Sequence, residues 1–317
     1  MSSLPLNTSF SLELPALQLA WDSTSMGALK ACPRKYHFSI MLGFRSKSTS
    51  VHLTFGILYH GALERYDHFR FAGADHETAL DRAVDWALCE SWDRELGRPW
   101  ASDDPNKNRY TLLRSIVWYL DEFPRDSDPL ETVILANGKP AVELSFRFES
   151  GYTAITGEPY LMCGHLDRIA SLEGDHFIAD RKTTKSALDE KYFSSFTPNH
   201  QFSQYLLAGQ IGYALPVKGI IVDAVQIGAT FSRYERRQIP RPPGSLEEWH
   251  QEWGQWVRLA EGFARAGTWP ANEASCGNYG GCEFREICSK APSVRDEWLR
   301  GRFARRIWDP LKTRGDI

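Results

Sequence analysis

The spacing of apolar residues predicts that most of the first 125 residues are helical, with residues 1–20 extended. Ser23 or Thr24 can begin a helix that runs to about Lys30, because a hydroxyl side chain accepts a hydrogen bond from a free N–H at a helix start. Pro33 then opens a second helix, since proline lacks an N–H that the first turn would leave unpaired. The same spacing predicts three further helices, over 57–71, 76–96 and 109–123.

After residue 130 the pattern changes to short segments in which strands and helices follow one another. Apolar side chains occupy every second position of 141–148, which predicts a strand with one buried face. Further strands are predicted at 161–171, 176–182 and 220–231, and helices at 201–213 and 246–266. This succession of elements predicts one α/β core.

We expect the chain to form a single unit with three consecutive parts. A helical part covers 21–125, the α/β core covers 130–266, and a cysteine-bearing segment covers 267–317. The last core helix carries a stripe at helical spacing, which predicts a buried face rather than a platform for nucleobases; it consists of Trp249, Trp253, Trp256, Ala260 and Phe263.

Composition and charge limit the class of protein. The net charge of −3 excludes a polycation, but a nucleic-acid groove needs only a local excess of positive charge. Two clusters offer one, or are simply solvated faces: Arg233, Arg236, Arg237 and Arg241, and Arg300, Arg302, Arg305 and Arg306. No run of about 18 apolar residues predicts a membrane span, and no signal peptide is recognisable, so we expect a cytoplasmic protein.

Two carboxylates and one amine are predicted to share a surface. If the chain turns at Glu173-Gly174, paired residues in the hairpin have numbers that add to 347, which places Asp167 opposite Asp180. Lys182 lies two residues further and projects from the same face. Opposed carboxylates destabilise a strand pair, so a divalent cation such as Mg²⁺ or Mn²⁺ is expected between them.

Two helical pairs are candidates to complete this site. His60 and Glu64 lie one helical turn apart, and His60 could supply an imidazole ligand or be a structural histidine. Gln201 and Tyr205 have the same spacing and could hold a water or a phosphate, or only cap the sheet.

Taken in order, these motifs resemble the RecB-like branch of the PD-(D/E)XK nuclease superfamily. The motifs are Gly56-x-x-x-His60-x-x-Leu63-Glu64, Gly164-x-x-Asp167, Asp180-x-Lys182 and Gln201-x-x-x-Tyr205. The resemblance implies a restriction-endonuclease-like core, with a central mixed sheet flanked by helices. It also implies metal roles for His60, Asp167, Asp180 and the Arg181 carbonyl, catalysis by Lys182, support from Gln201 and Tyr205, and a secondary acid at Glu143.

The cysteines extend the resemblance to the iron–sulfur members of that branch, such as the AddB nuclease domain, CRISPR-associated RecB-like nucleases and phage exonucleases. The resemblance implies a [4Fe–4S] cluster on Cys32, Cys276, Cys282 and Cys288. Family members often separate two of the late cysteines by two residues, whereas both late spacings here are five. Four thiolates also suit zinc, so zinc stays an alternative.

The resulting hypothesis is a Mg²⁺- or Mn²⁺-dependent deoxyribonuclease, an exonuclease on single-stranded DNA or DNA ends, in recombination, repair or phage DNA processing. A recombinase, a helicase or a CRISPR integrase is conceivable as a partner, in a bacterial or phage-infected cell. The alternative is a non-catalytic iron–sulfur scaffold that binds nucleic acid within a larger complex. A nuclease directed at RNA is a third hypothesis, although no residue pattern points to recognition of a 2′-hydroxyl.

Overall fold

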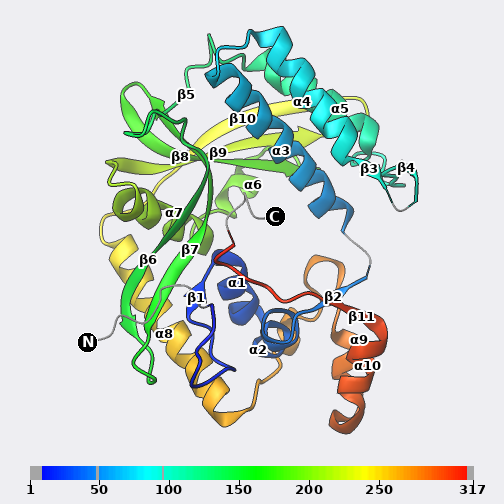
Figure 1. The fold of residues 1–317 in the computed structure, drawn as a ribbon, viewed down its shortest axis with the longest axis vertical. Coiled ribbons are helices and arrows are strands. Elements are labelled where there is room, and N and C mark those ends of the chain that lie inside the picture. The colour runs from blue at the N-terminus through cyan, green and yellow to red at the C-terminus, as the bar shows by residue number, and fades with distance from the viewer. Residues whose placement is uncertain (1–8, 48–49, 95, 313–317) are drawn as a thin grey trace. The chain divides into compact units, whose positions relative to one another are not determined.

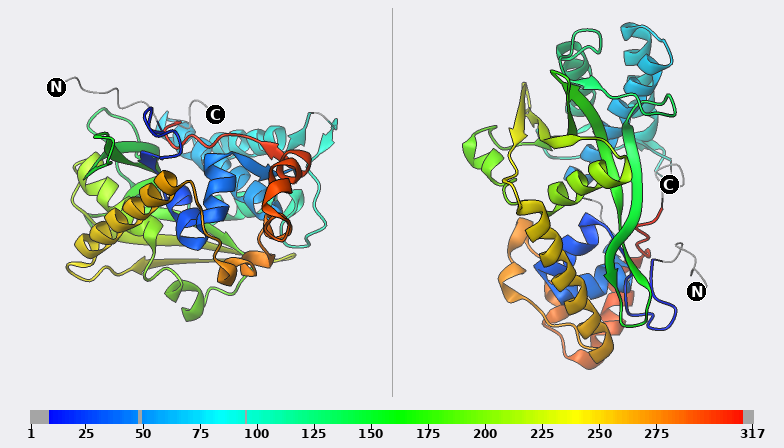
Figure 2. Two further views of the ribbon diagram at one scale, coloured as in Figure 1. Left: turned by 90° about the horizontal axis from the view of Figure 1, so that it is seen from below. Right: turned by 90° about the vertical axis from the view of Figure 1, so that its left-hand side faces the viewer.

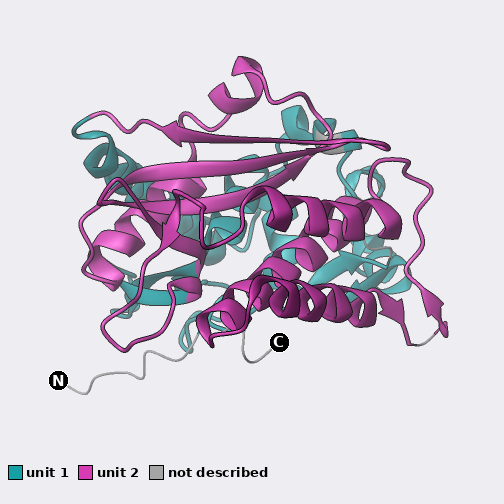
Figure 3. Ribbon diagram, turned by 90° about the horizontal axis from the view of Figure 1, so that it is seen from above, with its two compact units in different colours: residues 1–48, 145–164, 243–317 teal, residues 49–144, 165–242 magenta. Residues whose placement is uncertain are grey.

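A computed structural model describes residues 9–47, 50–94 and 96–312 of the chain. The chain divides into two compact units, coloured teal and magenta in Figure 3. The first unit combines residues 1–48, 145–164 and 243–317, and the second combines 49–144 and 165–242. Each unit therefore assembles segments that are far apart in the sequence. The predicted division into three consecutive parts stays a prediction.

The second unit is built on a mixed β-sheet. The hairpin of β7 and β8 is antiparallel, β8 and β9 run parallel, and β10 returns antiparallel along β9 at the end of the strand order. The mixed sheet that was expected is thereby confirmed. Its strands are β7 (Pro159–Leu172, shared with the first unit), β8 (Asp175–Thr184), β9 (Val217–Ile227), β10 (Ser232–Ile239) and the short β5 (Glu131–Thr132).

Helices cover both faces of this sheet. On one face α3 (Val51–Phe71), α4 (His76–Glu90) and α5 (Arg109–Glu122) lie side by side (Figure 1) and share a core with Val225 and Ile227 of β9. Side chains alternate along a strand, so the neighbouring positions face the other side. There α6 (Glu190–Ser194) and α7 (His200–Leu207) follow β8, and α7 continues into a π-helical turn over Ala208–Gly212. A small hairpin, β3 (Trp92–Asp93) and β4 (Arg98–Pro99), follows α4.

The first unit contains the outer part of the long hairpin β6 (Val142–Thr153) and β7, with β1 (Ala20–Trp21) parallel to β7. Helix α8 (Ser245–Ala266) lies along this hairpin (Figure 2, right), where the Trp253 ring is tilted against Tyr152 and edge-on to Tyr160. Trp249, Trp253 and Ala260 are buried, which confirms the predicted core role for these three members of the stripe, whereas Trp256 and Phe263 are half-buried. The remaining elements are α1 (Ser23–Ala31), α2 (Pro33–Tyr36) with a π-helical turn over His37–Met41, β2 (Phe44–Ser46), α9 (Arg285–Cys288), α10 (Arg295–Arg302), β11 (Phe303–Arg305) and the 3₁₀ turns Glu273–Ser275, Asn278–Gly280 and Pro292–Val294.

Several predicted boundaries were wrong for local reasons. The first helix is capped by Asp22, whose carboxylate accepts the N–H of Ser25, rather than by a hydroxyl. Helix α3 begins six residues before Ile57, because Gly56 is accommodated inside the helix. The strand predicted to reach residue 231 ends at Ile227, and the following strand, β10, was missed.

The missed turn between β9 and β10 is held by a residue distant in sequence. The guanidinium of Arg114 on α5 donates to the carbonyl oxygens of Gly228, Ala229 and Phe231. The spacing of neighbouring residues in the sequence could not predict these contacts. Within the described residues, no helix combines the length and apolar character needed to cross a membrane.

Candidate active site

The pairing register of β7 and β8 is the one predicted from the residue numbers of the hairpin. Ala170 pairs with Phe177, and Leu172 with Asp175, so paired numbers add to 347. The regular ladder ends at Arg168 and Ala179, one step before Asp167. At this point the Asp167 side chain connects the two strands, because its Oδ2 accepts the backbone N–H of Arg181 at 2.9 Å. The regular pairing of the hairpin therefore ends next to Asp167 and Asp180.

Helix α3 brings His60 to this opening. Its Nδ1 lies 3.4 Å from Asp167 Oδ2, the same oxygen that accepts the Arg181 N–H. Burial by itself would raise the pKa of Asp167. The charge and hydrogen bond of His60, with Lys182 and the Arg181 N–H, outweigh burial and hold that pKa well below its usual range. Asp167 is therefore a carboxylate at neutral pH and is available as a metal ligand.

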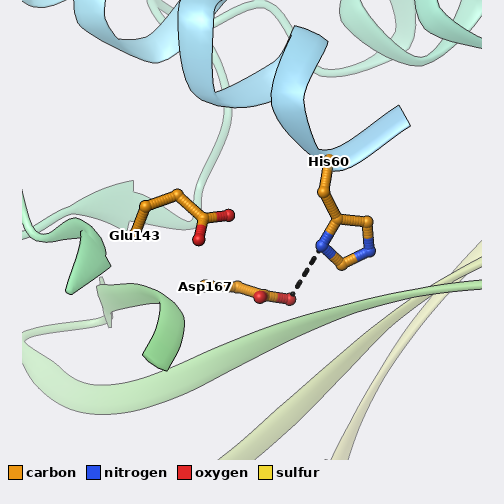
Figure 4. Close-up of side chains that lie close together, drawn as sticks. All are labelled: His60, Glu143 and Asp167. Atoms are coloured by element: carbon orange, nitrogen blue, oxygen red, sulfur yellow. Dashed lines mark ion pairs between the residues drawn. The ribbon is translucent and has the colours of Figure 1, made fainter. Parts of the chain in front are cut away.

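Glu143 completes a three-residue donor group with these two side chains. Ligand atoms of His60, Glu143 and Asp167 all lie within 4.8 Å of one another, and the three side chains converge in Figure 4. Glu143 has a φ of +50°, an uncommon conformation for a residue with a side chain, near the start of β6. Two carboxylates and an imidazole form a donor set suited to a divalent cation such as Mn²⁺. From the sequence, Glu143 was expected to be only a secondary acid, because the neighbouring residues do not show where the start of β6 lies relative to α3.

Asp180 and Lys182 form a second part of the site. Lys182 Nζ lies 2.6 Å from Asp180 Oδ2, and Asp180 is only 1% exposed. Burial is the main reason that the pKa of Asp180 rises to about 6, and the neighbouring charge of Asp167 adds to the rise. Burial lowers the pKa of Lys182, but the two aspartates outweigh it and the net shift is upward. Asp180 lies outside the 4.8 Å group of His60, Glu143 and Asp167.

The Gln201 and Tyr205 pair on α7 continues this second part. Lys182 Nζ donates to Gln201 Oε1 at 3.2 Å, and Gln201 Nε2 donates to the Tyr205 hydroxyl at 2.8 Å. Asn199 begins α7 by accepting the N–H of Phe202, whose ring lies under the Lys182 ammonium. The structure thus joins four of the predicted residues in one chain of polar contacts: Asp180, Lys182, Gln201 and Tyr205.

Arg181 points its side chain to the opposite face from Asp180 and Lys182. Its Nη2 lies 2.8 Å from Asp67 Oδ2 on α3, and both side chains are buried. The predicted ligand role of the Arg181 carbonyl stays a prediction. Asp67 was missed by sequence reasoning, although it lies two helical turns after His60 and therefore on the same helix face.

The four predicted cluster cysteines all belong to the first unit. Cys32 lies directly before Pro33 at the start of α2, as expected. The segment before Cys276 contacts it, since Asn272 donates its N–H to Cys32 Sγ at 3.3 Å and Ser275 Oγ donates to the Ala31 carbonyl at 2.6 Å. Burial raises the pKa of the Cys282 thiol, and Cys276 and Cys288 act on it electrostatically. Contacts thus join cysteine segments about 240 residues apart.

A family model and solved structures relate the chain to known proteins. A family model described as the PD-(D/E)XK nuclease superfamily matches residues 23–289. Among solved structures, a protein of Eubacterium rectale named as a candidate exonuclease is 12% identical, with a TM-score of 0.49, covering 94% of this chain and 98% of that one. SSO0001 is 19% identical, with a TM-score of 0.28, covering 47% and 59%. No curated protein matches the chain.

Proposed function

Because the chain belongs to the PD-(D/E)XK nuclease superfamily and has its restriction-endonuclease-like fold, we propose that it is a metal-dependent deoxyribonuclease. We propose an exonuclease that acts on single-stranded DNA or on DNA ends. One observation carries the proposal: His60, Glu143 and Asp167 present ligand atoms within 4.8 Å of one another. The half-buried Lys182 acts electrostatically on Asp167, a member of that group.

The donor set fits Mg²⁺ or Mn²⁺, with His60, Glu143 and Asp167 as ligands and with Asp180 and the Arg181 carbonyl as further candidates. Such an ion supplies an activated water and neutralises charge on the phosphate. Asp167 is already ionised in the protein, so no proton has to leave it for binding.

Lys182 is proposed to act as a cation. The two aspartates raise its pKa against the effect of burial, so its amine stays protonated at neutral pH. A protonated amine donates hydrogen bonds and cannot abstract a proton. Lys182 is therefore proposed to orient a water and stabilise charge on the phosphate rather than to deprotonate the water. Gln201 and Tyr205 would hold the amine in place through the contacts from α7.

For the four cysteines we propose a [4Fe–4S] cluster and, with it, membership of the iron–sulfur branch. The support is the contact between the Cys32 segment and the segment before Cys276. A cluster there would link the two ends of the chain within the first unit. Its proposed role is structural.

The nuclease proposal is tested with end-labelled single-stranded and duplex DNA, and with circular single strands that have no ends, in Mg²⁺ or Mn²⁺. We expect metal-dependent release of short products from linear substrates, abolished by EDTA and by Asp167→Asn. Cleavage of circles at the same rate would contradict the exonuclease assignment. Activity that survives both EDTA and Asp167→Asn would remove the proposed mechanism.

A further inference from the structure

Asp67 and Arg181 form an ion pair in the interior of the second unit. Arg181 is 3% exposed and Asp67 is 8% exposed. Of the carboxylates in the described residues, only that of Asp67 lies within 4.0 Å of the Arg181 guanidinium. Neither residue belongs to the three-residue donor group, and the proposed chemistry does not use their side chains.

The pair is linked to the metal site at both of its ends. Asp67 lies seven residues after His60 on α3, which is two helical turns along one face. Arg181 donates its backbone N–H to the Asp167 oxygen that also faces His60. The contacts therefore close a ring: His60, along α3 to Asp67, across to Arg181, through its own backbone to Asp167, and back to His60.

A second, partly buried pair lacks this link. Arg236 on β10 binds both carboxylate oxygens of Asp128, and its Nε lies 3.2 Å from Asp223. Like the first pair, it compensates charge at the sheet, but Asp128 lies in the loop after α5 rather than on a helix. It makes no contact with His60, Glu143 or Asp167 among the hydrogen bonds and ion pairs of the described residues. Charge compensation alone therefore does not require a connection to the donor group.

We propose that Asp67 and Arg181 are positioning residues that hold α3 against the end of the hairpin and set the separation of His60 and Asp167. The proposal rests on the proposed function, because it assigns the pair an effect on cation affinity. A rigid ring holds the donor atoms together before the ion arrives. Groups that orient metal ligands in this way typically change metal affinity by about 10–100-fold when they are removed.

The test measures Mn²⁺ binding by the electron paramagnetic resonance signal of free Mn²⁺, together with the unfolding midpoint in EDTA. Asp167→Asn identifies the site, Asp67→Asn breaks the ring, and Asp128→Asn is the control. We expect both Asp67→Asn and Asp128→Asn to lower the unfolding midpoint. Only Asp67→Asn should also weaken Mn²⁺ binding, by about ten-fold or more.

Asp67→Glu keeps the experiment decisive if Asp67→Asn does not fold. It preserves the charge but moves the carboxylate by one methylene, so we expect a midpoint nearer to that of the wild type and still weaker Mn²⁺ binding. Wild-type affinity in both Asp67 variants, or equal weakening by Asp128→Asn, would overturn the positioning role alone. A wild-type protein without a Mn²⁺ site that depends on Asp167 would overturn the proposed function as well.

Discussion

Lys182 Nζ lies 2.6 Å from Asp180 Oδ2, in the second part of the candidate active site. On one side of this contact, the charge of Asp167 in the donor group helps to raise the pKa of Asp180. On the other, Lys182 reaches Gln201 on α7. The contact therefore connects the proposed metal ligands to the side chains that would steady the catalytic amine.

Replacing Lys182 by Met should abolish most cleavage while leaving DNA binding in place. Removing one preorganised charge that stabilises a transition state costs about 10²–10³ in turnover. Lys185→Met is the control, since Lys185 is a nearby lysine that pairs with Asp104 at the surface. Single-turnover cleavage in Mn²⁺ measures the effect. Equal losses in both variants would indicate general electrostatics rather than a specific role for Lys182.

The elevated pKa of Asp180 predicts how stability depends on pH in EDTA. Between its ordinary value of 3.8 and about 6, the folded protein keeps a proton that the unfolded chain has released. The contribution of Asp180 to the free energy of unfolding therefore falls as pH rises through this window, by about 3 kcal/mol at most.

Denaturant unfolding of wild type and Asp180→Asn between pH 4 and 7 measures this contribution. The wild type should lose stability relative to the variant as pH rises. Asp167 does not interfere, because its pKa is lowered and its own contribution changes only below pH 3.8. Parallel curves for the two proteins would contradict the raised pKa of Asp180.

Replacing Glu143 by Gln should weaken Mn²⁺ binding by about ten-fold or more, because it removes one charged ligand from a three-residue donor group. Glu149→Gln is the matched control: it lies on the same strand, β6, but is exposed. Isothermal titration calorimetry with Mn²⁺ measures the affinity of both variants. If Glu143→Gln binds as tightly as Glu149→Gln, Glu143 is not a ligand.

Replacing Cys32 by Ser should lower the iron content of protein purified without oxygen and remove a broad absorbance near roughly 400 nm. It should also lower the unfolding midpoint, because the first unit would lose its link between distant segments. Cys89→Ser is the control, since Cys89 is exposed and belongs to the second unit. Zinc in place of iron in the wild-type protein would decide for the alternative metal.

Two glycines of α3 should respond in opposite ways to substitution by alanine. A Cβ added at Gly61 would overlap the indole ring of Trp86 on α4, so Gly61→Ala should destabilise the fold by about 1–3 kcal/mol. Gly56 has no such neighbour within 4 Å, so Gly56→Ala should stabilise it by about 0.5–1 kcal/mol through helix propensity. Thermal unfolding measures both, and shifts of the same sign would contradict the packing of α3 on α4.

The sequence by itself determined the features that depend only on residues close together in the chain. The turn at Glu173-Gly174 and strand alternation were enough to predict the register of β7 and β8 and the shared face of Asp180 and Lys182. Helical spacing likewise predicted that Gln201 and Tyr205 are neighbours. These relations depend on a few consecutive residues, whose geometry follows from the period of the strand or helix.

Only the tertiary structure decided which of these segments contact one another. It brought His60 and Glu143 to Asp167, paired Asp67 with Arg181, and held the missed turn before β10 with Arg114. Such contacts depend on how helices pack on the sheet, which is governed by burial and shape over the whole unit rather than by any local period. The sequence therefore predicted the hairpin of the site, and the packing of α3 and β6 against it decided the donor group.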